Sequence, residues 1–260
     1  MLKLSRPPRL VFGIVSVVFF LAAWEVIAWS GLLGSSVPAM FTTLSHTFEF
    51  LGQANSWAVI GETVAMALSG LLLAIVAGVA LGILIGLSAT VRHGSKVIVE
   101  FLKPVPPIVI LPVVVLVLGP TMGMGVFLVF IGCVIPILVQ TAAGVVDTDP
   151  VALDSARSFG IGKLETTLKV VLPSAMAFIG SSIRITAPIA LVVAVVAGLF
   201  GGGPGLGRLL MRAASSGQQT EVFSIVLVAG MLGLLFQSIS VVAERRVLHW
   251  HPSQRVEETR

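Results

Sequence analysis

The sequence predicts an all-α integral membrane protein with six transmembrane helices and both termini in the cytoplasm. Hydrophobic residues make up 56% of the 260 residues and charged residues only 11%, whereas soluble domains average about 45–50% and about 25%. Several apolar segments approach the length of about 20 residues that a spanning helix needs. Basic residues collect in alternate connections between these segments, as the positive-inside rule requires. So few charges argue against a soluble enzyme, and the high hydrophobicity argues against a disordered chain.

Six segments are apolar enough to be spans, the third being short and rich in proline: 10–29, 58–88, 104–119, 124–145, 175–200 and 222–243. Most basic residues flank these spans on one side of the membrane: Lys3, Arg6, Arg9, Arg92, Lys96, Lys103, Arg157, Lys163, Lys169, Arg245, Arg246, Arg255 and Arg260. This distribution places both termini, and a tail of residues 246–260, in the cytoplasm.

Residues 1–57 are expected to hold an anchor helix and a helix in the outer interface. The first apolar run follows basic residues, as in a secretory signal peptide, but it continues to Trp29 without a clear A-x-A cleavage site. An uncleaved anchor is therefore favoured. Phe41, Leu44 and Phe48 then recur at helical spacing, which indicates an amphipathic helix lying in the outer membrane interface.

Residues 58–245 are expected to form the core. The first core span has a small residue at every fourth position: Gly70, Ala74, Gly78, Gly82 and Gly86. Such a stripe lets a neighbouring helix approach backbone to backbone. The neighbour could belong to this chain or to a second copy.

Prolines and a few polar residues inside the core spans indicate a pathway through the membrane. Interior prolines break or kink helices, and broken helices are common where a membrane protein lines a path or moves. Simple kinked packing is the alternative. The candidate pathway residues are Thr141, Ser181, Arg184, Thr186, Pro136 and Pro188.

Arg184 is the main ionisable residue inside a predicted span, and an intramembrane charge is a functional candidate by default. A structural role is favoured, in which Arg184 snorkels to the cytoplasmic side or pairs with Glu100 or Asp147. The spans carry no series of acidic and histidine residues of the kind that proton-coupled pumps use, which argues against a secondary transporter.

The connection between the fourth and fifth spans predicts helices outside the membrane. Asp149 is a good N-cap, Pro150 suits the first helical position, and Gly160 suits the left-handed stop after a helix of about ten residues. Ala152, Ala156 and Phe159 are expected on one face, and a second short helix at Lys163–Val171 is expected to end before Pro173. The first helix could dock a cytoplasmic partner or simply lie in the interface.

The residues of this connection also carry a family resemblance. Asp154-Ser155-Ala156-Arg157-Ser158-Phe159-Gly160, followed by Val170-Val171-Leu172-Pro173, resembles the EAA loop of ABC importer permeases, in which Glu-Ala-Ala is followed after three residues by Gly and later by Leu-Pro. Other segments resemble the nitrate/sulfonate/taurine branch of that family in the same order along the chain: Gly78–Gly86, Pro104–Pro107, Thr141–Val145, Ser182–Ile185 and Gly205–Gly207.

The resemblance implies a type I importer permease in the bacterial inner membrane, with coupling helices at 150–172. It implies as partners a cytoplasmic ATPase dimer, a second permease copy, identical or different, and an extracytoplasmic substrate-binding protein. ATP and Mg would be bound by the ATPase, and this chain would be a pore subunit without cofactor or enzymatic activity. The ATPase-coupling residues would be Asp154, Ser155, Ala156, Arg157 and Gly160. Asp154 replaces the usual Glu, and Gly198 stands near the point after the fifth span where these permeases often carry an acidic residue.

The leading hypothesis is therefore an ATP-driven importer subunit for a small anionic or heterocyclic solute such as a sulfonate or nitrate. The alternative is an ion-coupled secondary transporter or channel that acts without an ATPase. An intramembrane enzyme has the least support, because the spans contain no paired carboxylates or histidine clusters.

Overall fold

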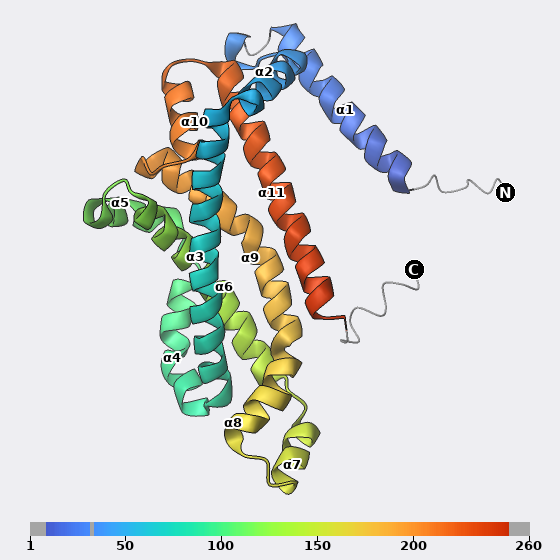
Figure 1. Cartoon of the computed structure of the whole chain (residues 1–260), viewed down its shortest axis with the longest axis vertical. Coiled ribbons are helices and arrows are strands. Elements are labelled where there is room, and N and C mark those ends of the chain that lie inside the picture. The colour runs from blue at the N-terminus through green and yellow to red at the C-terminus, as the bar shows by residue number, and fades with distance from the viewer. Residues whose placement is uncertain (1–8, 32–33, 250–260) are drawn as a thin grey trace, which may run out of the picture. The chain divides into compact units, whose positions relative to one another are not determined.

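The computed structural model describes residues 9–31 and 34–249. The predicted cytoplasmic residues Lys3, Arg6, Arg255 and Arg260 lie outside the described residues, as does most of the tail expected at 246–260. Within the described ranges the chain is helical and contains no strand (Figure 1).

The helices follow one another in this order: α1 Arg9–Ser30, α2 Met40–Gly52, α3 Ala54–Leu87, α4 Ala89–Leu102, α5 Pro107–Leu118, α6 Met122–Val146, α7 Pro150–Ser158, α8 Lys163–Thr166, α9 Leu172–Gly201, α10 Leu206–Ser215 and α11 Gln219–Val247. A short 3₁₀ turn occupies Gly34–Ser36, and a π-helical segment occupies Thr167–Val171.

Among the described residues, five helical segments are long and apolar enough to cross a membrane: Val11–Ser30, Ala54–Leu87, Met122–Val146, Lys163–Gly201 and Gln219–Val247. These five segments contain all of the predicted spans except the third. Only residue 10 of the first predicted span and residue 88 of the second fall outside them. The third predicted span is only the 12-residue α5, which at 1.5 Å per residue is about 18 Å long and too short to cross a hydrocarbon core of about 30 Å. It pairs with α4 across a 90° bend.

The contacts between helices show that the α4–α5 pair acts as one broken span. A Cβ atom added at Gly70, Gly78 or Gly86 of α3 would contact Val129, Ile137 or Val145 of α6, respectively. Because residue numbers rise together along this contact, α3 and α6 run parallel. Two parallel spanning helices require the chain between them to return across the membrane, and only α4 and α5 lie between them. The prediction of six crossings is therefore met, with the third crossing made by two bent pieces.

Helix α4 is the element that the sequence analysis did not anticipate, because its basic residues were assigned to a connection. Ser88 caps it by accepting a hydrogen bond from the Val91 amide at 3.3 Å, as N-cap serines do. Arg92 and Lys96 thus lie on a helix.

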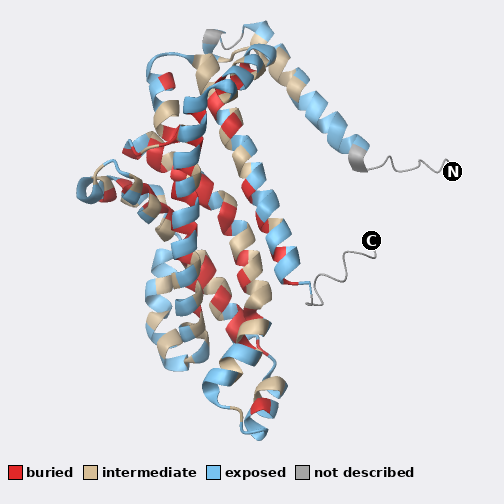
Figure 2. Ribbon diagram, viewed as in Figure 1, coloured by how far each residue is buried: buried red, intermediate tan, exposed pale blue. Residues whose placement is uncertain are grey.

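The small-residue stripe of α3 packs on α6 of the same chain. A Cβ atom at Gly82 would lie 2.5 Å from the Thr141 Cβ atom, and one at Gly86 would lie 2.5 Å from the Val145 Cβ atom. Only glycine permits so close an approach. Figure 2 shows the buried residues concentrated where α3, α6 and α9 meet, and the question of which chain supplies the neighbouring helix is settled.

The chain divides into two compact units, and each is described by itself. The first contains the described residues up to Trp57 and residues Leu209–Val228. In it, the Trp24 indole N–H donates to the Pro38 carbonyl at 3.1 Å, and the Met40 amide donates to Glu25 at 2.8 Å.

Helix α2 belongs to this first unit and spans the residues predicted for the outer interfacial helix. Its buried residues are Thr43, Thr47 and Phe50, whereas Phe41 and Phe48 are exposed. An apolar face left exposed is what a helix lying against lipid requires.

The second unit contains residues Ala58–Arg208 and the described residues from Ala229. The predicted helix end before Pro173 is wrong here, since α8 continues through the π-helical segment Thr167–Val171 into α9. Proline has no N–H to donate to the carbonyl of the preceding turn. The wider π turn directly before Pro173 accommodates this loss without ending the helix.

The glycine-rich turn after α9 is tied to α3. Gly205 has φ +101°, a conformation that favours glycine, and the Leu206 amide donates to the Thr63 hydroxyl at 2.8 Å. A Cβ atom at Gly198 would lie 3.1 Å from the Gly207 Cα atom. Gly198, where the resemblance led us to consider an acidic residue, is therefore a point of close backbone contact.

Candidate functional site

The predicted helix outside the membrane is α7, Pro150–Ser158. The Asp149 side chain caps it by accepting a hydrogen bond from the Val151 amide at 2.9 Å, and Pro150 occupies the first turn. Both features match the sequence prediction. An amide N–H in the first turn of a helix has no partner within the helix, and proline has no such N–H. Asp149 and Pro150 therefore fix where α7 begins.

The end of α7 is a Schellman motif. Gly160 has φ +72°, its amide donates to the Arg157 carbonyl at 3.0 Å, and the Ile161 amide donates to the Ala156 carbonyl at 3.0 Å. These two bonds satisfy the last carbonyls of the helix, and the left-handed residue favours glycine. The predicted role of Gly160 as the helix stop is confirmed.

One face of α7 is anchored to the core and the other is free in this chain. Ala156 is only 4% exposed, and Leu153 packs on a cluster of Val145, Val171, Ala175 and Ile179. Phe159, which was predicted on one face with Ala156, is 83% exposed and takes no part in this burial. Phe159 is the C-cap, its amide still donates to the Ser155 carbonyl at 3.0 Å, and the chain leaves the helical path after it.

The free face of α7 is both charged and apolar. Arg157 donates to Asp154 at 2.9 Å, and both side chains are well exposed. The Ser155 and Ser158 hydroxyls donate to carbonyls of their own helix at 2.8 and 2.9 Å. An exposed ion pair contributes little to stability. The pair, with Val151 and Phe159 beside it, is a surface suited to a protein partner.

After the turn at residues 159–162, the chain continues as one long helix into the membrane core. The segment Lys163–Gly201 is helical throughout, and Lys169 donates to Glu165 at 2.7 Å on its exposed side. Figure 1 shows α7 and α8 at the end of α9, toward the same end of this unit as the α3–α4 turn. Leu153 of α7 packs on a cluster that includes Ala175 and Ile179 of α9, so a displacement of α7 would reach α9 through this contact.

A family model described as "Binding-protein-dependent transport system inner membrane component" matches residues 74–249. This is about two thirds of the chain and includes α7, α8 and α9. The chain belongs to this family.

The curated relatives of this inner membrane component include transport permeases. It is 31% identical to the nitrate import permease protein NrtB of Leptolyngbya laminosa over 69% of this chain and 64% of that protein, a little under two thirds of its length. It is 26% identical to the taurine transport system permease protein TauC of Escherichia coli strain K12 over 95% of this chain and 92% of that protein.

Solved structures show the same fold. A chain of the MetNI methionine ABC transporter in an inward-facing conformation superposes with a TM-score of 0.65 at 18% identity, covering 75% of this chain and 99% of that one. A chain of a bacterial ABC transporter that imports alginate superposes with a TM-score of 0.66 at 13% identity, covering 92% of this chain and 99% of that one. The fold is that of a type I ABC importer permease.

The intramembrane charge of this inner membrane component has a partner that sequence reasoning missed. Arg184 donates to Glu244 of α11 at 3.0 Å, and the Ser181 hydroxyl donates to the other Glu244 oxygen at 3.1 Å. The predicted partners Glu100 and Asp147 are wrong. Glu244 directly follows the sixth predicted span. An acidic residue at the end of a span could have pointed to it as a partner for Arg184.

The remaining candidate pathway residues have different environments. Thr141 is buried between α6 and α3, with no hydrogen-bond partner for its hydroxyl among the described residues. Thr186 is buried and donates to the Ser182 carbonyl at 2.9 Å. Pro136 lines a cavity of about 320 Å³, and Pro188 lies inside α9. Of the candidate pathway residues, Ser181 and Arg184 share the partner Glu244, and Pro136 lines a cavity.

Proposed function

We propose that this chain is the pore-forming permease subunit of an ATP-driven, binding-protein-dependent importer of a small anionic nutrient. The observation that carries the proposal is α7, a capped helix outside the predicted spans with an exposed ion pair and an exposed Phe159, joined by a short turn to the continuous helix Lys163–Gly201 that includes α9. In a family of binding-protein-dependent transport components, such a surface fits a cytoplasmic ATPase.

In this proposal α7 enters a cleft of the ATPase, with Asp154, Ser155 and Arg157 at the contact and Ala156 and Gly160 holding the helix in shape. Closure of an ATPase dimer would push α7, and α9 would turn as a rigid element. ATP and Mg would be held by the ATPase subunits, which would supply the hydrolysis. Two permease subunits, alike or different, would enclose the path, and a binding protein outside would deliver the solute.

The substrate class rests on the relatives. The names of NrtB and TauC state nitrate and taurine, one an anion and the other a solute with an anionic sulfonate group. We propose a solute of this kind for the present chain.

The test compares Gly160→Val with Gly162→Val in the complex purified from native membrane in mild detergent. Gly160 has φ +72° and Gly162 has φ −66°, while neither has an atom within 4 Å of an added Cβ. Valine is therefore strained only at position 160. We expect a P-loop ATPase to co-purify with the wild type, and we expect Gly160→Val alone to lose ATP-dependent uptake several-fold while hydrolysis continues.

Two results would contradict the proposal. One is purification of the chain without an ATPase, together with transport by vesicles that hold this chain alone, which would favour the ion-coupled transporter or channel. The other is wild-type coupling in both glycine variants.

A further inference from the structure

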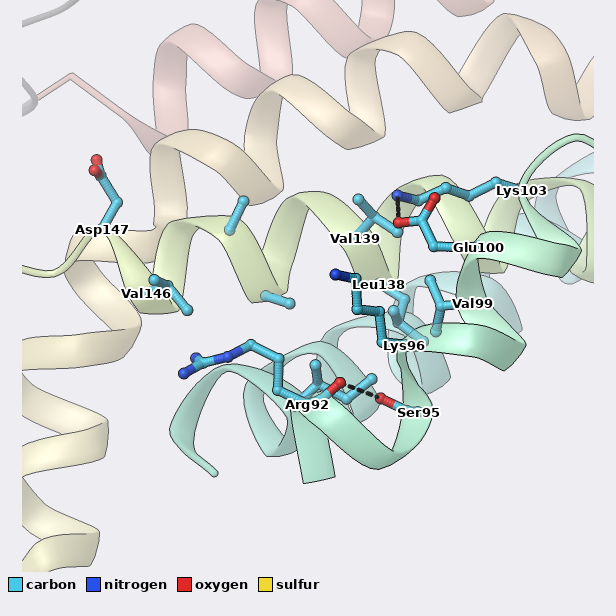
Figure 3. A pocket seen from close by; sticks show the side chains of 13 residues that line it. Arg92, Ser95, Lys96, Val99, Glu100, Lys103, Leu138, Val139, Val146 and Asp147 are labelled. Atoms are coloured by element: carbon cyan, nitrogen blue, oxygen red, sulfur yellow. Dashed lines mark hydrogen bonds and ion pairs between the residues drawn. The ribbon is translucent and has the colours of Figure 1, made fainter. Parts of the chain in front are cut away.

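A cavity of about 430 Å³ lies between α4 and the cytoplasmic half of α6 (Figure 3). Arg92 and Lys96 of α4 and Lys103 directly after it line the cavity, with apolar side chains such as Leu138 and Val139 on the α6 side. Figure 3 shows the Lys96 and Lys103 amino groups in the space between the two helices.

The cavity also has two carboxylates, and their positions limit the negative charge inside. Glu100 accepts a hydrogen bond from Lys103 at 2.7 Å, so this pair is neutral overall. Asp147 lies at the end of α6, where the chain leaves the membrane core. Three cationic side chains thus face two carboxylates in the lining, and the net charge of the lining is positive.

The two faces of α4 are arranged as they would be around water inside a membrane. Val97, Ile98 and Phe101 point away from the protein and are 62–77% exposed, and α4 contains no buried residue. The basic side chains instead line the cavity. Charged groups within membrane helices face the bundle interior or a water-filled space and mark solute paths, whereas a lipid-facing charge would be expensive.

Lys103 connects this cavity to a second one. Lys103 and Val139 also line the cavity of about 320 Å³ that is bordered by Pro136, Gln140 and Ser182. Two cavities that share a cation and a wall residue form a series along α6. The second contains neutral polar groups, so its charged lining residue is Lys103.

We propose that Arg92, Lys96 and Lys103 form a cationic vestibule that draws small anions between the pocket at Gln140 and Ser182 and the cytoplasm, with Arg92 and Lys96 supplying the net positive charge and Lys103, the cation that both cavities share, offsetting Glu100. A cleft lined by one sign of charge with low-dielectric walls concentrates ions of the opposite sign. This inference rests on the proposed transport function and assigns its charge selectivity to particular side chains.

The test needs no transported substrate, because it measures how fast a cysteine in the vestibule reacts with thiol reagents of opposite charge. Val139→Cys is introduced after the buried Cys133 is changed to Ala, and Ala142→Cys serves as a second position in the same cavity. The reagents are an anionic 2-sulfonatoethyl and a cationic trimethylammonioethyl methanethiosulfonate. The protein, with its co-purifying partners, is held in nanodiscs of phosphatidylcholine or of phosphatidylglycerol.

We expect the anionic reagent to be favoured, and the ratio of the two rates to fall roughly five- to tenfold in Lys103→Gln. The matched control Lys163→Gln removes an exposed lysine on α8 and should leave the ratio unchanged. Glu100→Gln should raise the ratio, because it leaves the Lys103 charge uncompensated. High salt should reduce all of these differences.

Equal ratios in Lys103→Gln and Lys163→Gln would overturn the proposal, as would a lack of reaction at both cysteines in both lipids. Reaction that occurs only in phosphatidylcholine would show that an anionic headgroup fills the cavity, and it would replace the proposal with a lipid site. If the protein showed no uptake but the reaction ratios changed as expected, the result would count against the proposed transport function and not against the vestibule.

Discussion

Arg184 and Glu244 show how a charged pair is placed at the edge of a membrane protein. Glu244 is only 5% exposed, while Arg184 is 42% exposed. Glu244 lies three residues before the end of α11, so the pair is near the cytoplasmic boundary, where Arg184 can keep part of its guanidinium toward water. The buried carboxylate depends on Arg184 and Ser181 for its partners.

We therefore expect Arg184→Met to destabilise the protein by about 1–3 kcal/mol, because it leaves a buried carboxylate without its cation. The double variant Arg184→Met/Glu244→Gln should recover most of this loss, since no unpaired charge remains. Thermal unfolding in detergent measures both, with the exposed Arg212→Met as the control. If Arg184→Met and Arg212→Met lower the Tm equally, the ion pair does not stabilise the fold.

The contact between α3 and α6 depends on particular small residues of α3. Small residues at every fourth position of α3 permit contact with Val129, Ile137, Thr141 and Val145 of α6. In a membrane, helix association relies on such close packing, because lipid tails remove the hydrophobic driving force between helices. A methyl group in this contact should therefore be costly.

We expect Gly82→Ala to cost about 1–3 kcal/mol, because its Cβ atom would lie 2.5 Å from the Thr141 Cβ atom and 2.8 Å from the Leu138 carbonyl oxygen. Gly61→Ala in the same helix is the matched control, since nothing lies within 4 Å of its added Cβ atom. That change should be neutral or stabilise by up to about 1 kcal/mol. A Tm for Gly82→Ala at or above that of Gly61→Ala would contradict the expectation.

For the molecule as a whole, helix directions decide the topology. Helices α3 and α6 run parallel, and α9 runs opposite to α6, with Gly132 near Val193 and Gly144 near Phe178. Helix α11 runs opposite to α9, because Arg184 meets Glu244 while Gly180 lies near Leu248. The end of α11 and α7 therefore share one side, in agreement with the positive-inside assignment.

This topology predicts opposite labelling of two cysteines in a Cys133→Ala background. Pro120→Cys, between α5 and α6, should react with an impermeant reagent added to intact cells, whereas Ser158→Cys at the end of α7 should react only in inside-out vesicles. Both should react after permeabilisation. Labelling with the two sides exchanged would show that α4 and α5 form a re-entrant loop, and labelling of both positions from the same side would show that α6 does not cross between them.

The sequence by itself determined the membrane class, five of the six spans, their orientation and the boundaries of α7. These features depend on local composition or on a few adjacent residues, such as Asp149, Pro150 and Gly160. Only the tertiary structure decided that the glycine stripe meets α6, that Arg184 pairs with Glu244, and that the third crossing is bent at the end of α4. Each of these joins residues distant in sequence, and helix rotation and packing, which no local pattern specifies, determine which side chains meet.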